Sequence, residues 1–466
     1  MSRSRSPSMP VPVAVVTLGC PKNQVDSEVM QGLLAKEGFR LVEKPEQAAV
    51  LVVNTCGFID AAKEESVDTL LQLAKLKKKG KCELLIAAGC LAQRYPEELI
   101  NEIQELDGVV GTGDFQKIAE LCREKLKPAH DTAPVSFTEH VAFLYDAATP
   151  RRRIGANHTA YVKVAEGCNY RCSFCAIPSF RGDLKSRSID SVVKEVEQLA
   201  KEGVKEINLI AQSLTSYGWD WRTNGNGSAK PNAQALPQLL KRLAPIKGVE
   251  WLRLFYTYPT DFSDGLIELM ANEPKLCKYV DLPLQHINDR ILKAMNRKGK
   301  RKEIEQLIDR LRRSIPDLSL RTTFIVGFPG EGEAEFEELA DFVRETGFDR
   351  IGVFTYSPEE GTAAFPLGDP VTAEQKTERR QRLLDLQEEI AGDRLSVMIG
   401  RKLRVLIDGL SEDGSDRLEA RHQGQAPEID GVVMLEKSKK QPSPGDLVTV
   451  EVTDTVGYDL IGRVTT

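Results

Sequence analysis

The chain has 466 residues, with 63 Lys and Arg against 69 Asp and Glu, a formal net charge of −6 and 41% hydrophobic residues. Nine cysteines are too sparse, and odd in number, for a disulfide framework, and the N-terminal segment MSRSRSPSMPVPV has no apolar core of signal-peptide length. We therefore expect a cytoplasmic, reducing environment and no membrane partner.

Three strand-like runs in the first part of the chain each end in a cysteine. They read VAVVTLGC, AVLVVNTC and ELLIAAGC, and they end at Cys20, Cys56 and Cys90, each beside a glycine and each followed by a helix-like stretch. If the strands are parallel neighbours, the three thiols emerge at the C-terminal edge of one sheet, where open α/β folds bind ligands. This pattern predicts one cluster site. The cysteines without strand-end placement are expected to be buried small hydrophobic residues: Cys82, Cys122 and Cys277.

A second cysteine triplet lies in the segment GCNYRCSFCAIP. Cys168, Cys172 and Cys175 are separated by three residues and then by two. Such a compact loop can place three thiolates on one iron–sulfur cluster, and a four-iron cluster then keeps one iron open. A structural zinc site would need a fourth ligand, and the nearest candidate, His158, lies upstream at the start of an expected strand rather than in the loop.

The loop follows the first of six strand-like runs, and strands alternate with amphipathic helices along this part of the chain, which predicts six units of a partial (β/α) barrel. Polar residues at strand ends are expected to converge on the edge that carries the cysteine loop: Gln212, His286, Arg321 and the GFPGE turn from Gly327 to Glu331. The expected strands are Ala160 to Val164, Glu206 to Ile210, Trp251 to Tyr258, Tyr279 to Leu284, Leu318 to Val326 and Ile351 to Tyr356.

The stretch from about Ser396 onward is a series of short strands separated by Gly, Pro and Asp turns, which predicts a small β-rich module. It contains nine Lys and Arg against twelve Asp and Glu, a net charge of −3. An RNA-binding module should be basic, so this charge favours a docking surface for a basic partner. A local basic patch at Lys437 to Lys440 remains the alternative.

The spacing of the second triplet resembles the signature of the radical S-adenosylmethionine enzymes. The resemblance implies a 4Fe-4S cluster held by Cys168, Cys172 and Cys175, whose fourth iron binds the amino and carboxylate groups of S-adenosylmethionine. It also implies residues that line the cofactor. The alternatives are that the loop aromatic simply packs into its own domain, that the polar residues are satisfied at a barrel rim, and that the Gly-Pro turn only starts a helix. The implied lining residues are Phe174, beside the adenine, and Gln212, His286, Arg321 and Gly327.

With both triplets, the chain resembles the methylthiotransferases over nearly its whole length. This implies an α/β protein with an N-terminal open parallel α/β domain that holds an auxiliary cluster, a linker, a partial (β/α)6 radical barrel and a small C-terminal antiparallel β-barrel of the TRAM type. The expected boundaries are 11–127, 128–153, 154–395 and 396–466. Arg151 to Arg153 are interpreted as part of the linker.

The resemblance also implies two 4Fe-4S clusters and a reaction. Because an unactivated methylene has no acidic proton, a side-chain base is inadequate and radical chemistry from a cofactor is required. The radical cluster cleaves S-adenosylmethionine to a 5'-deoxyadenosyl radical, which abstracts a hydrogen atom. The auxiliary cluster at Cys20, Cys56 and Cys90 holds or supplies the sulfur, and a second S-adenosylmethionine gives the methyl group. The electrons would come from a donor such as flavodoxin or ferredoxin.

The segment LGCPKNQVDSE, from Leu18 to Glu28, resembles the branch that modifies the β-carbon of an aspartate in small-subunit ribosomal protein S-twelve. The branch that acts on transfer RNA typically has Gln-Met where this chain has Pro21 and Lys22. Together with the acidic C-terminal module, this favours a basic protein over nucleic acid as the substrate. A transfer-RNA adenosine methylthiotransferase and a non-enzymatic iron–sulfur or zinc scaffold remain the alternatives.

Overall fold

The computed structural model describes residues 10–127, 133–140, 143–221, 233–411, 414, 416–437 and 441–465. They form two compact units, and the second cysteine triplet is divided between them, since Cys168 and Cys175 belong to the first unit and Cys172 to the second. Two predicted segments, the linker 128–153 and the patch 437–440, lie partly outside the described residues. The first unit contains Met1–Gly155, Ala165–Tyr170 and Cys175–Arg187, and the second contains Ala156–Val164, Arg171–Phe174 and Ser188–Thr466.

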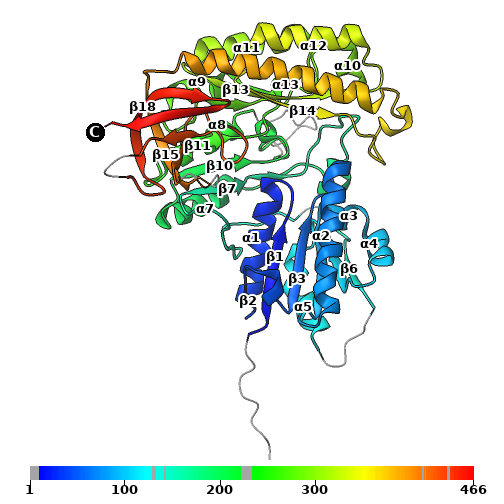
Figure 1. Cartoon of the computed structure of the whole chain (residues 1–466). Coiled ribbons are helices and arrows are strands. Elements are labelled where there is room, and N and C mark those ends of the chain that lie inside the picture. Colours follow the sequence, from blue (N-terminus) through cyan, green and yellow to red (C-terminus); the bar gives the residue numbers. More distant parts are fainter. Residues whose placement is uncertain are drawn as a thin grey trace, which may run out of the picture. The chain divides into compact units, whose positions relative to one another are not determined.

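The first unit is built on a parallel six-stranded sheet with the order β2-β1-β3-β4-β5-β6 (Figure 1). The three strands that lead to cysteines, β1, β3 and β4, are hydrogen-bonded neighbours, as predicted. A small antiparallel pair, β8 with β9, belongs to the same unit. The strands are β1 (Pro12–Thr17), β2 (Arg40–Leu41), β3 (Val50–Thr55), β4 (Leu84–Gly89), β5 (Gly108–Val110), β6 (Val135–Phe137), β8 (Ala165–Glu166) and β9 (Lys185–Ser186).

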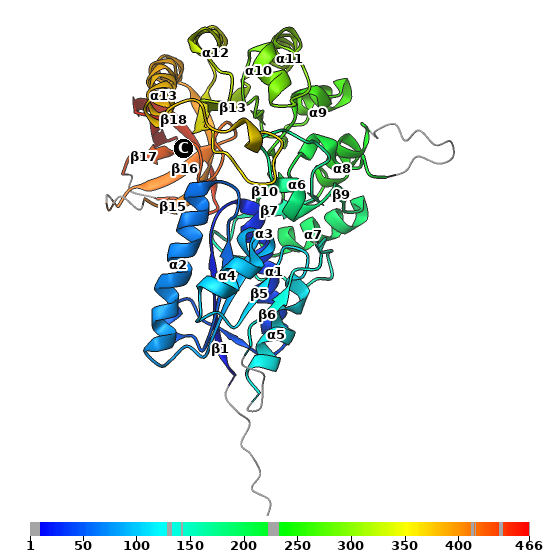
Figure 2. The same cartoon turned by 90° about the vertical axis from the view of Figure 1, so that its right-hand side faces the viewer.

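Helices cover both faces of this sheet (Figure 2). β3 and β4 are buried along their whole length, which explains why they read as continuous apolar runs rather than as alternating patterns. Side chains of α1 and α5 pack on one face, and those of α2, α3 and α4 pack on the other. The helices are α1 (Pro21–Lys36), α2 (Asp60–Lys78), α3 (Cys90–Arg94), α4 (Pro96–Glu102), α5 (Ile118–Lys125) and α6 (Ile177–Arg181).

The second unit contains the six predicted barrel strands, arranged as two parallel three-stranded sheets, β11-β10-β7 and β12-β13-β14. The predicted strand from Trp251 to Tyr258 is shorter in the structure, because Tyr256 has a φ of 59° and the extended conformation ends before it. The strands are β7 (Thr159–Lys163), β10 (Glu206–Ile210), β11 (Trp251–Leu254), β12 (Tyr279–Asp281), β13 (Ser319–Val326) and β14 (Arg350–Thr355).

Amphipathic helices separate these strands, as the sequence predicts. Ser188 caps the first of them by accepting a hydrogen bond from the amide of Ser191, and Thr372 caps the last one in a capping box with Gln375. No helix among the described residues combines the length and the apolar character that crossing a bilayer requires. The helices are α7 (Ile189–Lys201), α8 (Ala235–Leu243), α9 (Asp264–Asn272), α10 (Asp289–Ala294), α11 (Arg301–Ser314), α12 (Glu333–Thr346) and α13 (Ala373–Ser396).

The end of the chain forms a closed five-stranded barrel with the order β15-β16-β17-β19-β18, and it belongs to the second unit. Four of its five strand pairings are antiparallel, as predicted, but the pairing of β17 with β19 that closes the barrel is parallel. Val405, Ile407, Val433, Val450 and Leu460 fill its interior without exposure. The strands are β15 (Lys402–Leu410), β16 (Leu418–His422), β17 (Val433–Leu435), β18 (Leu447–Val456) and β19 (Asp459–Val464).

Candidate functional site

The first cysteine triplet lies where three neighbouring strands of the first unit end. Cys20 precedes the first residue of α1, Cys56 follows β3 directly, and Cys90 is the first residue of α3. Cys56 and Cys90 are buried, and Cys20 is half-buried. None of these three cysteines forms a disulfide. The predicted convergence of three sequence-distant cysteines at one sheet edge is therefore what the strand order produces.

Glycines allow these strand ends to approach one another closely. Gly19 has a φ of 86°, and a Cβ built on it would lie 2.9 Å from the Cβ of Cys56. A Cβ on Gly57 would lie 2.9 Å from the backbone nitrogen of Leu91, next to Cys90. Any side chain at either glycine would push the cysteines apart, so these positions require glycine for space, and Gly19 also for its backbone conformation.

Burial keeps the thiols of Cys56 and Cys90 protonated in the absence of a metal. Burial, only partly opposed by the charge of Arg181, raises the pKa of Cys90 to about 12, and burial also raises the pKa of Cys56. Cys20 and Cys56 also act electrostatically on Cys90, so the three sulfurs share one environment. A bound cation would reverse this preference, since metal ligation requires thiolates.

One arginine that the sequence reasoning did not single out points into this cluster. Arg181 ends α6 and is buried, and its Nη2 donates hydrogen bonds to Cys90 Sγ at 3.1 Å and to Asn23 Oδ1 at 2.6 Å. Its Nη1 forms ion pairs with Asp26 Oδ2 at 2.7 Å and with Glu166 Oε2 at 3.3 Å. The guanidinium therefore places one positive charge directly against the buried cysteines.

The segment that follows Cys175 packs on the first triplet within the same unit. Ala176, Ile177 and Phe180 form an apolar cluster with Cys90. The Thr112 hydroxyl, from the loop after β5, donates a hydrogen bond to the backbone carbonyl of Phe180. α6 is thus held against the cysteine edge of the sheet by apolar packing as well as by Arg181.

The motif around Cys20 has a structural basis in α1. Asn23 Nδ2 donates to the carbonyls of Leu18 and Thr55, both at 3.0 Å, and so ties α1 to the ends of β1 and β3. Asn23, Asp26, Ser27 and Glu28 are all buried, which gives this helix a polar face inside the protein. A helix whose polar residues recur three and four positions apart beside a cysteine is a signal that could have revealed these contacts from the sequence.

Arg151, which the sequence places in the linker, is anchored on α1. Two nitrogens of its guanidinium contact one carboxylate oxygen, Glu28 Oε2, at 2.6 Å from Nε and 2.5 Å from Nη2, and both side chains are buried. The backbone of Ile154 also donates to Glu28 Oε1 at 3.0 Å. Gly32 lets this segment lie directly on α1, since a Cβ there would meet the backbone of Pro150 at 2.4 Å. The segment is anchored because its charge is needed to satisfy a buried carboxylate.

In the second unit, the loop residue Cys172 lies near an arginine. Arg297 Nη1 is 3.8 Å from Cys172 Sγ, and its guanidinium stacks on the ring of Tyr258 with the centroid at 4.2 Å. Ser173 fixes the backbone here, since its amide donates to the carbonyl of Met295 at 2.9 Å and its hydroxyl to that of Ala294 at 2.8 Å. This part of the loop therefore has a defined conformation.

Two predicted cofactor-lining residues, Phe174 and Gln212, belong to the second unit. Phe174 is half-buried and packs against an apolar cluster that includes Ile291, Met295 and Phe328, which matches the alternative of a loop aromatic packing into its own domain. Gln212 is half-buried two residues after the end of β10. Cofactor contact by these residues stays a prediction.

Two residues of the predicted GFPGE turn, Gly327 and Glu331, lie in a group of buried polar contacts that includes His286. Glu331 Oε1 accepts a hydrogen bond from the amide of Gly327 at 2.9 Å and pairs with Arg379 of α13 at 2.8 Å. Its other oxygen lies 3.3 Å from Nε2 of His286, and both side chains are completely buried. Gly327 has a φ of 76°, and a Cβ there would lie 2.4 Å from Lys376. This arrangement shapes the turn from inside the protein.

Arg321 does not lie at the strand end where it was predicted. It is the third of eight residues in β13, near the N-terminal end of the strand, whereas the cysteine loop follows the C-terminal end of β7. Its guanidinium pairs with Asp281 of β12 at 2.9 Å and lies 3.8 Å from Asp430 of the terminal barrel. The expected strand from Leu318 to Val326 already places Arg321 near its beginning, so the expected cofactor contact has no geometric support.

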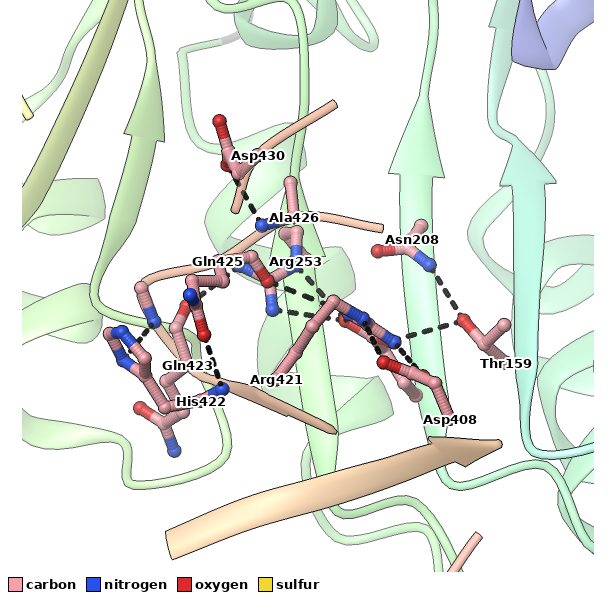
Figure 3. A network of polar contacts seen from close by, with 12 residues as sticks. Thr159, Asn208, Arg253, Asp408, Arg421, His422, Gln423, Gln425, Ala426 and Asp430 are labelled. Carbon is pink, nitrogen blue, oxygen red and sulfur yellow. Dashed lines mark hydrogen bonds and ion pairs between the residues drawn. The ribbon is translucent and has the colours of Figure 1, made fainter. Parts of the chain in front are cut away.

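The terminal barrel is joined to the (β/α) strands by a buried charge network (Figure 3). Arg421 of β16 forms ion pairs with Glu206 of β10 and with Asp408 of β15, at 2.7 and 2.8 Å. Burial acts to raise the pKa of Glu206, but Arg421 and Arg253 outweigh it and hold this pKa at about 2. His158, the candidate fourth zinc ligand, lies 3.1 Å from Asp408 in the same network.

The donor set at the sheet edge fits an iron–sulfur cluster. Three cysteines converge there, their surroundings are largely dry, and one cation faces a sulfur. In the described part of the chain no group of three His, Cys, Asp or Glu side chains has ready-made ligand geometry for a metal ion, so ligation by either triplet stays a prediction. Three ligands rather than four are what a cluster with one open iron requires.

Three family models match the chain in succession. The uncharacterized protein family UPF0004 matches residues 12–111, the Radical SAM superfamily matches residues 162–343, and the TRAM domain matches residues 399–465. The first match covers five of the six strands of the parallel sheet, the second overlaps every strand of the partial barrel except β14, and the third covers the closed terminal barrel.

The chain is also similar to curated proteins over nearly its whole length. The ribosomal protein uS12 methylthiotransferase RimO of Desulfitobacterium hafniense (strain Y51) is 47% identical over 456 residues, covering 97% of this chain and 98% of that protein. The protein of the same name from Geobacter sulfurreducens is 45% identical over 452 residues, covering 97% and 98%.

Among solved structures, the fold is similar to that of the radical S-adenosylmethionine methyltransferase TsrM from Kitasatospora setae, with cobalamin and a [4Fe-4S] cluster bound. The TM-score is 0.55, the identity is 15%, and the alignment covers 77% of each chain. At this identity the similarity concerns the fold alone.

Proposed function

The chain belongs to the ribosomal protein uS12 methylthiotransferases, and from this premise we propose that it adds a methylthio group to the β-carbon of an aspartate in uS12. The observation that carries the proposal is the convergence of Cys20, Cys56 and Cys90 at one sheet edge, in a chain whose second triplet has the spacing of a radical S-adenosylmethionine loop. One triplet alone would not imply sulfur transfer.

The cofactors of this enzyme are S-adenosylmethionine and 4Fe-4S clusters. We assign one cluster to Cys168, Cys172 and Cys175 and an auxiliary cluster to the first triplet. When bound, they supply a substrate radical and the sulfur that this radical takes up, which acid–base side chains cannot do at an unactivated methylene.

The surrounding residues position these groups and exclude water. Asn23 ties α1 to two strand ends, and Ser173 fixes the loop backbone beside Cys172. In each triplet, an arginine nitrogen faces a cysteine sulfur: Arg181 faces Cys90, and Arg297 faces Cys172. Such contacts around the ligands orient them and offset part of the negative charge of a thiolate-bound cluster.

The charges of the terminal barrel support a protein substrate over transfer RNA. A module that binds RNA needs cations available for phosphates. Here four of the five arginines from Ser396 onward are engaged within the second unit, since Arg421 is buried in the network described above and three others form ion pairs with carboxylates. The three pairs are Arg401–Asp317, Arg404–Glu250 and Arg463–Glu451.

The reaction needs electrons from outside the chain, and we propose flavodoxin or ferredoxin as their source. Modification of a ribosomal protein together with oxygen-sensitive clusters fits a reducing cytoplasm. The alternative substrate, adenosine in transfer RNA, would use the same cysteines, so the choice between the two depends on the docking surface rather than on the clusters.

The proposal is tested by separating the two triplets. The reconstituted, reduced enzyme is incubated with uS12 and S-adenosylmethionine, and 5'-deoxyadenosine and the modified aspartate are measured. Cys172→Ala is expected to abolish both products, whereas Cys56→Ala is expected to abolish only the methylthio product and to retain 5'-deoxyadenosine. A Cys56→Ala enzyme that still methylthiolates uS12 would refute the assignment of the auxiliary site.

A further inference from the structure

We infer that Arg181 is a positioning residue of the auxiliary cluster, which binds the Cys90 sulfur and raises the reduction potential of that cluster. The inference rests on the proposed function, because it assumes that Cys20, Cys56 and Cys90 hold a cluster.

The guanidinium of Arg181 contacts a cysteine sulfur in addition to the carboxylates with which it forms ion pairs. Nη1 satisfies the two buried carboxylates, Asp26 at 2.7 Å and Glu166 at 3.3 Å. Nη2 faces the other way and donates to Cys90 Sγ at 3.1 Å and to Asn23 Oδ1 at 2.6 Å. Only a planar fork with several donors can bind carboxylates on one side and a sulfur on the other, so lysine would not replace it.

The placement of Arg181 in the chain links the two triplets. α6 begins two residues after Cys175 and ends at Arg181, and its apolar side chains pack with Cys90. The helix that leaves the radical loop is therefore fixed to a ligand of the auxiliary cluster by both packing and a hydrogen bond. Arg181 lies in this position because the sequence CAIPSFR places it at the last turn of that helix.

The charge balance gives the direction of its effect on the cluster. Two buried carboxylates pair with the guanidinium, and three thiolates would bind the cluster beside it. These negative charges outnumber the charge of Arg181 and the positive charge of the iron–sulfur core together, so the site is negative even with Arg181 present. Reduction adds a further negative charge. A positive charge and an N–H···S hydrogen bond both stabilise the reduced form, so removing them lowers the reduction potential.

The experiment uses the full chain with only the auxiliary cluster. The parent variant carries Cys168→Ala, Cys172→Ala and Cys175→Ala and is reconstituted with iron and sulfide. Its iron content and its midpoint potential, followed by electron paramagnetic resonance during a redox titration, are compared with those of Arg181→Met and Arg181→Lys in the same background.

Two further variants keep the result interpretable. The double variant Asp26→Asn, Arg181→Met removes one buried carboxylate together with the cation, so that fewer unpaired buried charges disturb folding. It is compared with Asp26→Asn alone. Arg187→Met is the matched control, because Arg187 is also a buried arginine of this unit but stacks on the ring of Tyr145 at 4.3 Å.

The expected result is a lower midpoint potential after Arg181→Met in both backgrounds, a smaller decrease in Arg181→Lys, and no change in Arg187→Met. If folded Arg181 variants bind iron and keep an unchanged midpoint potential, the inference about Arg181 is overturned while the proposed cluster stands. The same holds if Arg187→Met lowers the midpoint potential as much as Arg181→Met does. A parent variant that binds no iron would overturn the proposed auxiliary cluster, and the inference with it.

Discussion

Replacing Glu206 by Gln removes the carboxylate that two buried arginines share. Arg253 and Arg421 both pair with it, and all three side chains are at most 3% exposed. The fall in the pKa of Glu206 from the ordinary 4.5 to about 2 corresponds to about 3 kcal/mol of stability. Because the variant leaves two guanidinium groups buried beside a neutral amide, we expect a loss of about 3–5 kcal/mol.

The loss should depend on pH in a defined direction. The pKa of Glu206 is lower in the folded protein, so its contribution is complete above about pH 4.5 and disappears as the pH falls towards 2. At pH 3.5 the native protein should already have lost about 1.4 kcal/mol of this contribution. The difference between native protein and Glu206→Gln should therefore shrink between pH 5 and pH 3.5.

Urea unfolding followed by tryptophan fluorescence measures this loss, because Trp219, Trp221 and Trp251 all lie in the second unit. Glu250→Gln is the matched control, since its ion pair with Arg404 is largely exposed and should contribute at most about 1 kcal/mol. Equal losses in the two variants, or a difference that grows as the pH falls, would refute the reasoning.

Three further changes test other parts of the account. Gly19→Ala should lower the free energy of unfolding by about 1–2 kcal/mol and reduce bound iron by about half, because φ is positive at this position and the new Cβ would lie 2.9 Å from the Cβ of Cys56. An unchanged iron content would contradict this prediction. Arg151→Met should destabilise the first unit by about 3–5 kcal/mol, measured by urea-dependent proteolysis, because Glu28 loses its buried partner, and a loss below about 1 kcal/mol would argue against an anchored segment. Modification of uS12 should slow as salt rises, since docking of a basic protein is electrostatic, and a rate independent of salt would count against the acidic surface.

The sequence predicted the elements whose patterns are local. The three apolar runs that end in cysteines are neighbouring strands, and the strand–helix alternation that begins just before the cysteine loop forms the six strands of the partial barrel. A small β-rich module was predicted from its turn residues, and the family resemblance implied an antiparallel β-barrel. The parallel pairing of β17 with β19 was not predicted, because strand direction there depends on contacts distant in the sequence.

The contacts around the sites were less predictable. Arg181 and Cys90 are 91 positions apart, and Arg151 and Glu28 are 123 apart, so no periodicity connects them. Arg321 was misplaced although its position near the start of the expected strand was readable from the sequence; its partner Asp281, 40 positions away, was not. The spacing of the polar residues on α1 was the local signal for these contacts. Asn and Asp on a buried face of a helix must find hydrogen-bond partners inside the protein.

The most direct test of the account offers the reconstituted, reduced enzyme equal amounts of uS12 and transfer RNA, with S-adenosylmethionine labelled in its methyl group. Mass spectrometry then locates the added sulfur and labelled methyl. The account predicts the label on one aspartate of uS12. Label on adenosine, with uS12 unchanged, would contradict it.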